Sequence, residues 1–175
     1  MNETRPPAVA GLFYPGQEPG LAREVAALMA AQASPDPGAP PKAIIAPHAG
    51  YAYSGGAAAA VFSTLAQARG TIERIVLLAP AHTMPLQGIA APAATAFETP
   101  LGTMPIDRDA LARAGKLPFV VESDAAHASE HAIEVELPSC RRCWTRLASC
   151  LSSSAEPAPK TWRSFCISSG AAKRR

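Results

Sequence analysis

Two stretches of this sequence repeat one arrangement, in which an apolar run ends at Ala-Pro and a histidine follows. Residues 42–48 read K-A-I-I-A-P-H, and residues 72–82 read I-E-R-I-V-L-L-A-P-A-H. Isoleucine and valine favour strands, and proline cannot donate to a sheet ladder, so each predicted strand should end at its proline. The apolar residues 57–68 between them predict a helix, with Ser54 as its N-cap.

A strand, a helix and a second strand in this order predict two parallel, neighbouring strands. His48 and His82 should therefore lie at the same carboxyl edge of the sheet. Metal ligands in proteins are commonly imidazoles from separate loops, so the two histidines could share an ion. The alternative is a pair of unrelated loop histidines that hold no ligand.

The remaining chain alternates between helical and strand patterns, which indicates an α/β fold with a central β-sheet flanked by helices. We expect the first strand over Ala43–Ala46 and the second over Ile72–Leu78. The other expected elements are a helix over Leu21–Gln32, a short strand over Gln87–Pro92, a turn over Phe97–Gly102, a helix over Asp107–Ala114 capped by Asp107, a strand over Phe119–Glu122 and a helix in the later part of Ser123–Pro138.

Composition predicts one domain, because 175 residues with 48% hydrophobic content suffice for a single core. No apolar segment reaches the roughly 18 residues of a membrane span, and the first residues lack a basic region followed by an apolar core. We therefore expect a cytoplasmic protein that does not enter a membrane.

Charge and residue usage change at Pro138. Residues 1–138 hold eight Lys and Arg and thirteen Asp and Glu, whereas residues 139–175 hold eight Lys and Arg and a single acid, Glu156. All four histidines precede Pro138, and all four cysteines follow it. The two parts of the chain do not look alike.

Residues 127–131, H-A-S-E-H, match the H-x-x-E-H signature of a class of zinc hydrolases. In that class two histidines one helical turn apart hold zinc, and the glutamate acts as base. Such an enzyme needs a third protein ligand, and Glu156 is the one acid after Pro138. The alternative that we favour places His127 in solvent at a helix start, with Glu130 and His131 facing the pocket of His48 and His82.

The cysteines of the tail follow the spacing C-x2-C-x6-C-x15-C from Cys140 to Cys166. The first pair is a possible zinc half-site, but the second pair is badly spaced for a zinc finger. The basic tail has few aromatic residues among its charges, so we expect no nucleic-acid partner.

Five motifs in succession closely resemble the MEMO family, whose bacterial members are called AmmeMemoRadiSam system protein B. The resemblance covers residues 5–138 and is carried by Gly11-Leu12-Phe13-Tyr14-Pro15, Ala46-Pro47-His48-Ala49-Gly50-Tyr51 with Tyr53-Ser54-Gly55, Ala79-Pro80-Ala81-His82, Thr99-Pro100-Leu101-Gly102 and Glu130-His131-Ala132-Ile133-Glu134-Val135-Glu136-Leu137-Pro138.

The resemblance implies a fold similar to class III extradiol dioxygenases, with one non-haem metal ion in a pocket. It implies that His48 and His82 are metal ligands, that Tyr51, Glu130 and His131 line the pocket, and that His131 serves as acid or base. Iron or copper is favoured over zinc. A metal-dependent oxidoreductase is the function implied; the alternative is a non-catalytic scaffold for AMMECR-type and radical-SAM proteins.

This chain departs from the family pattern at two places. Ala79-Pro80-Ala81-His82 stands where the family usually has Gly-Pro-Asn/Ser-His, and the family's later Ser-Asp-x-x-His segment and metal-binding cysteine have no counterpart. We interpret residues 1–138 as the N-terminal part of a MEMO-like domain.

We interpret residues 139–175 as an out-of-frame, non-native tail, which would leave the domain truncated. A frameshift near the Pro138 codon explains it. When the tail from Pro138 onward is back-translated with GC-rich codons and read from the third base of each codon, it gives F-L-Q-A-V-L-D-T-A-R-V-V-P-L-V-V-G. That string contains a β run, whereas the tail as written predicts neither a strand nor a helix.

Overall fold

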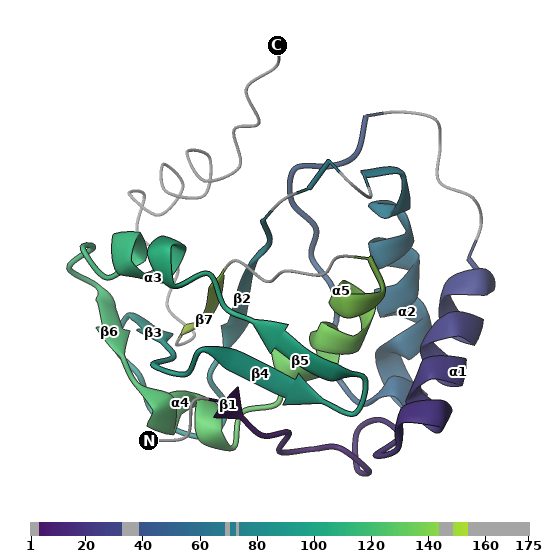
Figure 1. Cartoon of the computed structure of the whole chain (residues 1–175), viewed down its shortest axis with the longest axis horizontal. Coiled ribbons are helices and arrows are strands. Elements are labelled where there is room, and N and C mark those ends of the chain that lie inside the picture. Colours follow the sequence, from purple (N-terminus) through teal and green to yellow (C-terminus); the bar gives the residue numbers. More distant parts are fainter. Residues whose placement is uncertain (1–3, 33–38, 69–70, 73, 144–148, 154–175) are drawn as a thin grey trace.

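The α/β class expected from the sequence is confirmed by the structure, a computed structural model that describes residues 4–32, 39–68, 71–72, 74–143 and 149–153. Its strands are divided between two small sheets, and helices flank them (Figure 1).

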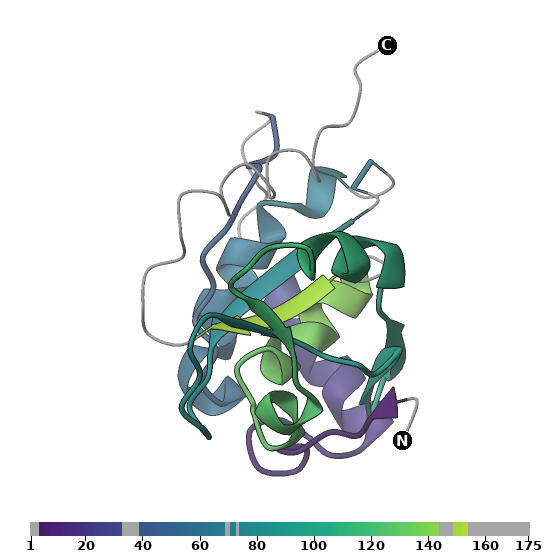
Figure 2. The ribbon, with the colours of Figure 1, turned by 90° about the vertical axis from the view of Figure 1, so that its left-hand side faces the viewer.

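The larger sheet has the strand order β2-β7-β3-β6. Its strands are β2 (Val76–Pro80), β7 (Ser149–Ser153), β3 (Ile89–Ala91) and β6 (Val120–Glu122). Strand β7 pairs in parallel with β2 and antiparallel with β3, and β3 pairs in parallel with β6. Figure 2 shows β2 and β7 side by side near the middle of the molecule.

The smaller sheet has the order β1-β4-β5, formed by β1 (Thr4–Arg5), β4 (Ala96–Thr99) and β5 (Gly102–Pro105). Strands β4 and β5 form a hairpin, so the expected turn over Phe97–Gly102 is the end of a longer β structure. Strand β1 pairs with β4, so the N-terminal segment lies beside residues from the middle of the sequence.

The helices α1 (Glu18–Ala30), α2 (Tyr51–Ser63) and α5 (Leu137–Cys143) pack together on one side of the molecule (Figure 1). Helix α3 (Arg108–Ala114) is capped as predicted, since the Asp107 side chain accepts from the Ala110 N–H. The other helical elements are η1 (Ala66–Ala68), α4 (Asp124–Ala128) and η2 (Glu134–Glu136).

The expected strand over Ala43–Ala46 is wrong, because these residues belong to neither sheet. A strand needs a ladder partner. Strand β2 pairs with β7, and a cavity is lined both by β2 and by residues 41–46. The predicted neighbouring parallel pair is therefore not formed, although the two segments border the same cavity.

Helix α2 begins earlier than predicted. Gly50 is its N-cap, and Tyr51 is its first residue. The prediction that Ser54 caps the helix is wrong; its hydroxyl lies within the first turn and donates to the Ala49 carbonyl. The extension includes Gly55 and Gly56, which are poor helix formers, but Tyr51 is held in place by its hydrogen bonds to the Phe13 and Val135 carbonyls.

The predicted helix in the later part of residues 123–138 is divided. Helix α4 ends at Ala128, and η2 starts at Glu134. Between them the Glu130 carboxylate accepts the N–H groups of His131 and Ala132. Such a side-chain bond to nearby N–H groups competes with continuing the helix.

The tail contains regular structure where the sequence predicted none. Helix α5 extends to Cys143, with Leu137 and Cys140 buried three residues apart, and β7 lies in the centre of the larger sheet. The prediction that the written tail forms neither a helix nor a strand is therefore wrong for these residues. Most of the cysteine pattern and of the basic charge lies outside the described side chains.

The main core joins both sheets to the helices. Phe62 and Leu65, Ile89, Phe97 and Leu137 are among its buried residues. A second cluster, around Leu21 and Tyr51, packs the N-terminal segment on α1 and α2. Across the part of the chain that the structure describes, no helix is both long enough and apolar enough to cross a membrane.

Candidate metal site

Three histidines from separate segments converge at one place. The ring centres of His48 and His82 lie 5.3 Å apart, those of His82 and His131 4.7 Å apart, and those of His48 and His131 6.1 Å apart. The predicted closeness of His48 and His82 is thus confirmed, although His48 does not follow a strand. His131, from the segment between α4 and η2, joins them.

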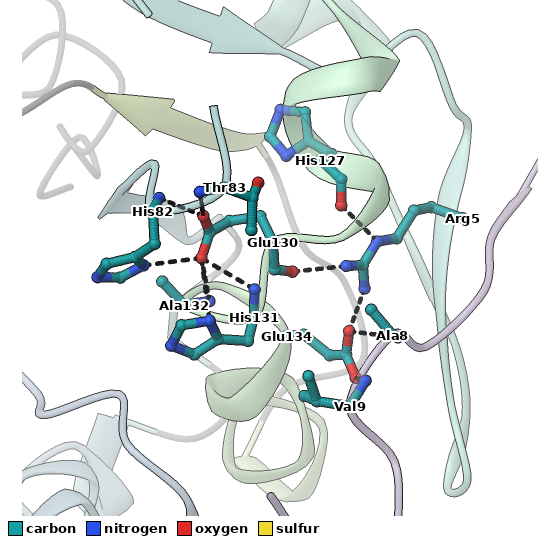
Figure 3. Close-up of polar contacts among 10 residues, drawn as sticks. All are labelled: Arg5, Ala8, Val9, His82, Thr83, His127, Glu130, His131, Ala132 and Glu134. Carbon is teal, nitrogen blue, oxygen red and sulfur yellow. Dashed lines mark hydrogen bonds and ion pairs between the residues drawn. The ribbon is translucent and has the colours of Figure 1, made fainter. Parts of the chain in front are cut away.

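The carboxylate of Glu130 faces the rings of His82 and His131 (Figure 3). Its Oε1 lies 2.9 Å from His82 Nδ1 and 3.3 Å from His131 Nδ1. His82, Glu130 and His131 each offer a ligand atom, and these atoms lie within 4.8 Å of one another. This group could hold a metal ion.

The carboxylate of Glu130 is buried yet well solvated by protein groups. Its Oε1 accepts the His131 and Ala132 N–H groups at 2.9 and 3.0 Å, and its Oε2 accepts those of His82 and Thr83. Burial by itself would raise the pKa of Glu130, but the hydrogen bonds from His82 and Ala132 outweigh it and lower the pKa to about 2. Glu130 is therefore an anion throughout the physiological range.

The surroundings of His48 favour its neutral form. Burial lowers its pKa first, and the neighbouring His82 and His131 lower it further, against the opposing effect of Glu130. A histidine must be neutral to bind a metal. The surroundings of His48 therefore favour the form that can be a ligand.

A buried ion pair fixes the segment that carries Glu130 and His131. Arg5, on β1, donates to the carbonyls of His127 and Glu130 and forms an ion pair with Glu134 (Figure 3). Arg5 is 6% exposed and the Glu134 side chain is fully buried. The N-terminal strand thus holds the segment 127–134 in place.

Glu134 also organises the N-terminal loop. Its carboxylate accepts the N–H groups of Ala8 and Val9 and the hydroxyl of Tyr14. Burial, followed by the bond to Glu134, raises the pKa of Tyr14 above its ordinary range. The Gly-Leu-Phe-Tyr-Pro segment is therefore attached to the same network as the site.

His127 is not part of the cluster. Its ring is 2% exposed, with Nε2 3.1 Å from the Ala90 carbonyl, and it packs on the edge of Phe97. The prediction that His127 lies in solvent is wrong, and His127 and His131 do not share a helix face. The structure does not bring the two histidines of the H-x-x-E-H pattern together, so the zinc-hydrolase interpretation has no assembled site.

Tyr51 lies in the core at the start of α2. Its hydroxyl donates to the Val135 carbonyl at 3.1 Å, and its ring packs against Tyr14. Burial is the main cause that raises its pKa. The role of Tyr51 as a pocket residue stays a prediction.

Two important residues were missed by sequence reasoning. Arg5 belonged to no predicted element, and Glu134 was part of the predicted helix in the later part of residues 123–138. The signal that was available is that Glu130, Glu134 and Glu136 occur within a mostly apolar stretch, where each acid needs a partner or a function.

Known proteins of one family are similar to most of this chain. A family model described as Memo-like protein matches residues 5–147. The chain is similar to MEMO1 family proteins of Aquifex aeolicus, at 38% identity over 138 residues, and of Ignicoccus hospitalis, at 40% over 143 residues. These alignments cover 79% and 77% of this chain but 49% and 50% of the relatives. The chain thus spans about half the length of these relatives.

Proposed function

Because this chain belongs to the Memo-like protein family, we propose that its clustered histidines hold one transition-metal ion for oxidoreductase chemistry in the whole protein. The convergence of three imidazoles over one carboxylate carries the proposal. Imidazoles bound to one ion through bonds of about 2.0–2.1 Å have ring centres between about 4.5 and 6 Å apart. The three separations of 4.7, 5.3 and 6.1 Å are close to that range.

The donor set fits the ion. In His82 and His131 the Nδ1 atom faces Glu130, which leaves Nε2 of each ring on the far side from the carboxylate. A carboxylate that accepts one ring N–H of a histidine fixes the tautomer and orientation of that ligand. We assign His48, His82 and His131 as ligands and Glu130 as the group that orients two of them.

Imidazole nitrogens suit iron and copper among other transition metals, and the family resemblance favours these two ions over zinc. When bound, such an ion supplies electron transfer and activation of a bound substrate. The side chains contribute orientation and access: Glu130 is 1% exposed and fixed, whereas His82 is 42% exposed and leaves the site open to solvent. A similarity to class III extradiol dioxygenases is the family expectation that this arrangement supports.

Metal titration of single variants tests the ligand assignment. We expect one equivalent of Fe(II) or Cu(II) to bind, and His82→Ala or His131→Ala to abolish binding. Glu130→Gln should weaken binding by about 10–100-fold, as expected for loss of an orienting partner. Complete loss with Glu130→Gln would instead make Glu130 a direct ligand, and unchanged binding in all three variants would reject the site.

The earlier suggestion of His131 as acid or base requires that it be free of the ion. A spectroscopic titration of Cu(II) in His131→Ala separates the two roles, because loss of a nitrogen ligand changes the copper spectrum. An unchanged copper spectrum would show that His131 is not a ligand and would favour the acid–base role.

An alternative function is a scaffold for AMMECR-type and radical-SAM proteins. Exposed apolar side chains favour it: Leu12 is 81% exposed and Tyr53 92% exposed. They lie on two segments that a hydrogen bond between the Tyr51 N–H and the Phe13 carbonyl joins. Association lost in Leu12→Ser and Tyr53→Ser, with metal binding intact and no oxygen uptake with catechol-type substrates, would favour the scaffold.

A further inference from the structure

A cavity of about 340 Å³ lies beside the histidine cluster. Its lining includes β2 and, from the segment before His48, residues 41–44 and Ala46. Phe62 and Leu65 contribute an apolar surface at the end of α2 and just beyond it. Since an apolar cavity of about 150 Å³ takes up benzene, this one has room for about two fused rings.

The described lining is mostly apolar, and Glu136 is the one acidic residue in it. Glu136 belongs to the cavity wall and is 8% exposed. Both of its carboxyl oxygens are fully buried and lack a hydrogen-bond partner among the described residues. This differs from Glu130 and Glu134, each of which accepts several hydrogen bonds. A buried polar atom without a partner is uncommon and indicates a missing ligand or water.

The surroundings of Glu136 define the ligand's head group. Burial raises the pKa of Glu136 to about 8, so at neutral pH the group is mostly a carboxylic acid, which can both donate and accept. A hydroxyl group also donates and accepts, and so it pairs with both oxygens of the acid. Lys42 and Arg74 lie in the same lining and disfavour a cationic ligand.

We propose that this cavity binds an uncharged, apolar molecule of about two rings through one hydroxyl group. The hydroxyl pairs with the carboxyl group of Glu136 after that group turns toward the cavity, because its oxygens are fully buried in the structure. His48 belongs both to the cavity lining and to the histidine cluster, so the bound molecule lies next to the cluster. That it is a substrate of the metal ion rests on the proposed function; the binding itself does not.

Fluorescence titration of the full chain with matched naphthalene probes tests the proposal. The probes are 2-naphthalenemethanol, 2-methylnaphthalene and 2-naphthalenemethylamine, all measured in the presence of a chelator. We expect the alcohol to bind about tenfold more tightly than the methyl compound, since it adds one buried hydrogen-bonded group. Equal binding of these two probes, tightest binding of the amine, or no binding of any probe would overturn the proposal.

Two substitutions locate the binding. Glu136→Leu should remove the preference for the alcohol over the methyl compound, whereas Glu136→Gln should keep it, because an amide also donates and accepts. Glu18→Leu, at an exposed position on α1, is the matched control and should change nothing. A preference that survives Glu136→Leu would contradict the assignment.

A blocking variant separates this proposal from the metal site. Ala46→Trp fills the cavity from its wall and should abolish binding of the alcohol and the methyl compound. Because every titration contains chelator, failure of the metal titration leaves these results unaffected. Probe binding that persists in Ala46→Trp would place the probe elsewhere and overturn the proposal.

Discussion

Arg5 and Glu134 are the pair on which the geometry of the metal site depends most. Arg5 spans from β1 to the carbonyls of His127 and Glu130, and its charge is opposed by the fully buried Glu134. Removing one partner of such a pair leaves an uncompensated charge in the core. The pair therefore links the N-terminal strand to the residues that would bind a metal.

We predict that Arg5→Met lowers the free energy of unfolding by about 3–5 kcal/mol, the usual cost of breaking a buried ion pair. Arg74→Met is the control. Arg74 pairs with Asp107 on the surface, with side chains 33% and 26% exposed, so this change should cost less than about 1 kcal/mol. Urea denaturation measures the free energy of unfolding of both variants. Equal losses in Arg5→Met and Arg74→Met would contradict the importance of the buried pair.

Glu136 should make stability depend on pH. Its pKa rises from 4.5 to about 8 on folding, so between these values the folded chain keeps a proton that the unfolded chain has released. Stability is therefore fully present below about pH 4.5 and decreases as pH rises to about 8, by up to about 1.4 kcal/mol per pH unit.

Urea denaturation at pH 6 and pH 8.5 tests this with Glu136→Gln as the reference. We expect wild type to lose more stability than the variant between these two values, since glutamine does not titrate. Parallel losses in the two proteins would show that Glu136 is not the group responsible.

The site residues differ in how far sequence could identify them. His48 and His82 were expected to lie close together because both follow an Ala-Pro pattern, and they do, although the parallel strand pair behind that inference does not form. The partnership of Arg5 with Glu134 was not predicted, because the two residues are 129 positions apart and no sequence pattern connects them. His127 was misplaced because a five-residue match says nothing about where the helix ends.

Among the secondary-structure elements, the start of β3 depends on one glycine. Gly88 has φ +88°, and a Cβ there would lie 2.3 Å from the Phe119 carbonyl oxygen. That carbonyl also accepts the Ile89 N–H, where β3 approaches the segment leading into β6. Both the conformation and the contact exclude a side chain.

We predict that Gly88→Ala destabilises the protein by at least about 2 kcal/mol through backbone strain and the clash. Gly56→Ala is the contrasting control, because Gly56 lies within α2 and its added Cβ would meet nothing within 4 Å. That change should stabilise by about 0.5–1 kcal/mol. Thermal unfolding shows whether each substitution raises or lowers the stability. An unchanged stability in Gly88→Ala would contradict the close approach of Gly88 to the Phe119 carbonyl.

The predicted elements succeed where local signals are strong. Asp107 caps α3, and β3 and β6 lie within the predicted strands, because a capping residue marks the helix and a short apolar run marks each strand. Ala43–Ala46 has the same composition as a strand yet forms none. Strand formation depends on a partner edge, which a single segment does not reveal.

For the molecule as a whole, strand β7 is the unusual element. It occupies a central position between β2 and β3, but its sequence is S-C-L-S-S. Strands covered on both faces usually have continuous Val, Ile and Leu. The frame-shifted reading supplies V-V-P-L-V-V across this same stretch.

We therefore keep the frameshift near Pro138 as a proposal, which resequencing of the gene across the codons for Leu137–Cys143 tests directly. If it holds, the chain with the frame restored should unfold at a higher temperature and in a sharper transition than the 175-residue chain, because the written tail offers a poor central strand. Equal stability of the two chains would contradict this.

The metal site is the central claim, and the most direct measurement is a calorimetric titration of the full chain with Fe(II) under anaerobic conditions. We predict binding of one equivalent that is lost in His82→Ala and retained in His127→Gln, whose position is buried against Ala90 outside the cluster. Binding that survives His82→Ala but disappears in His127→Gln would contradict the account.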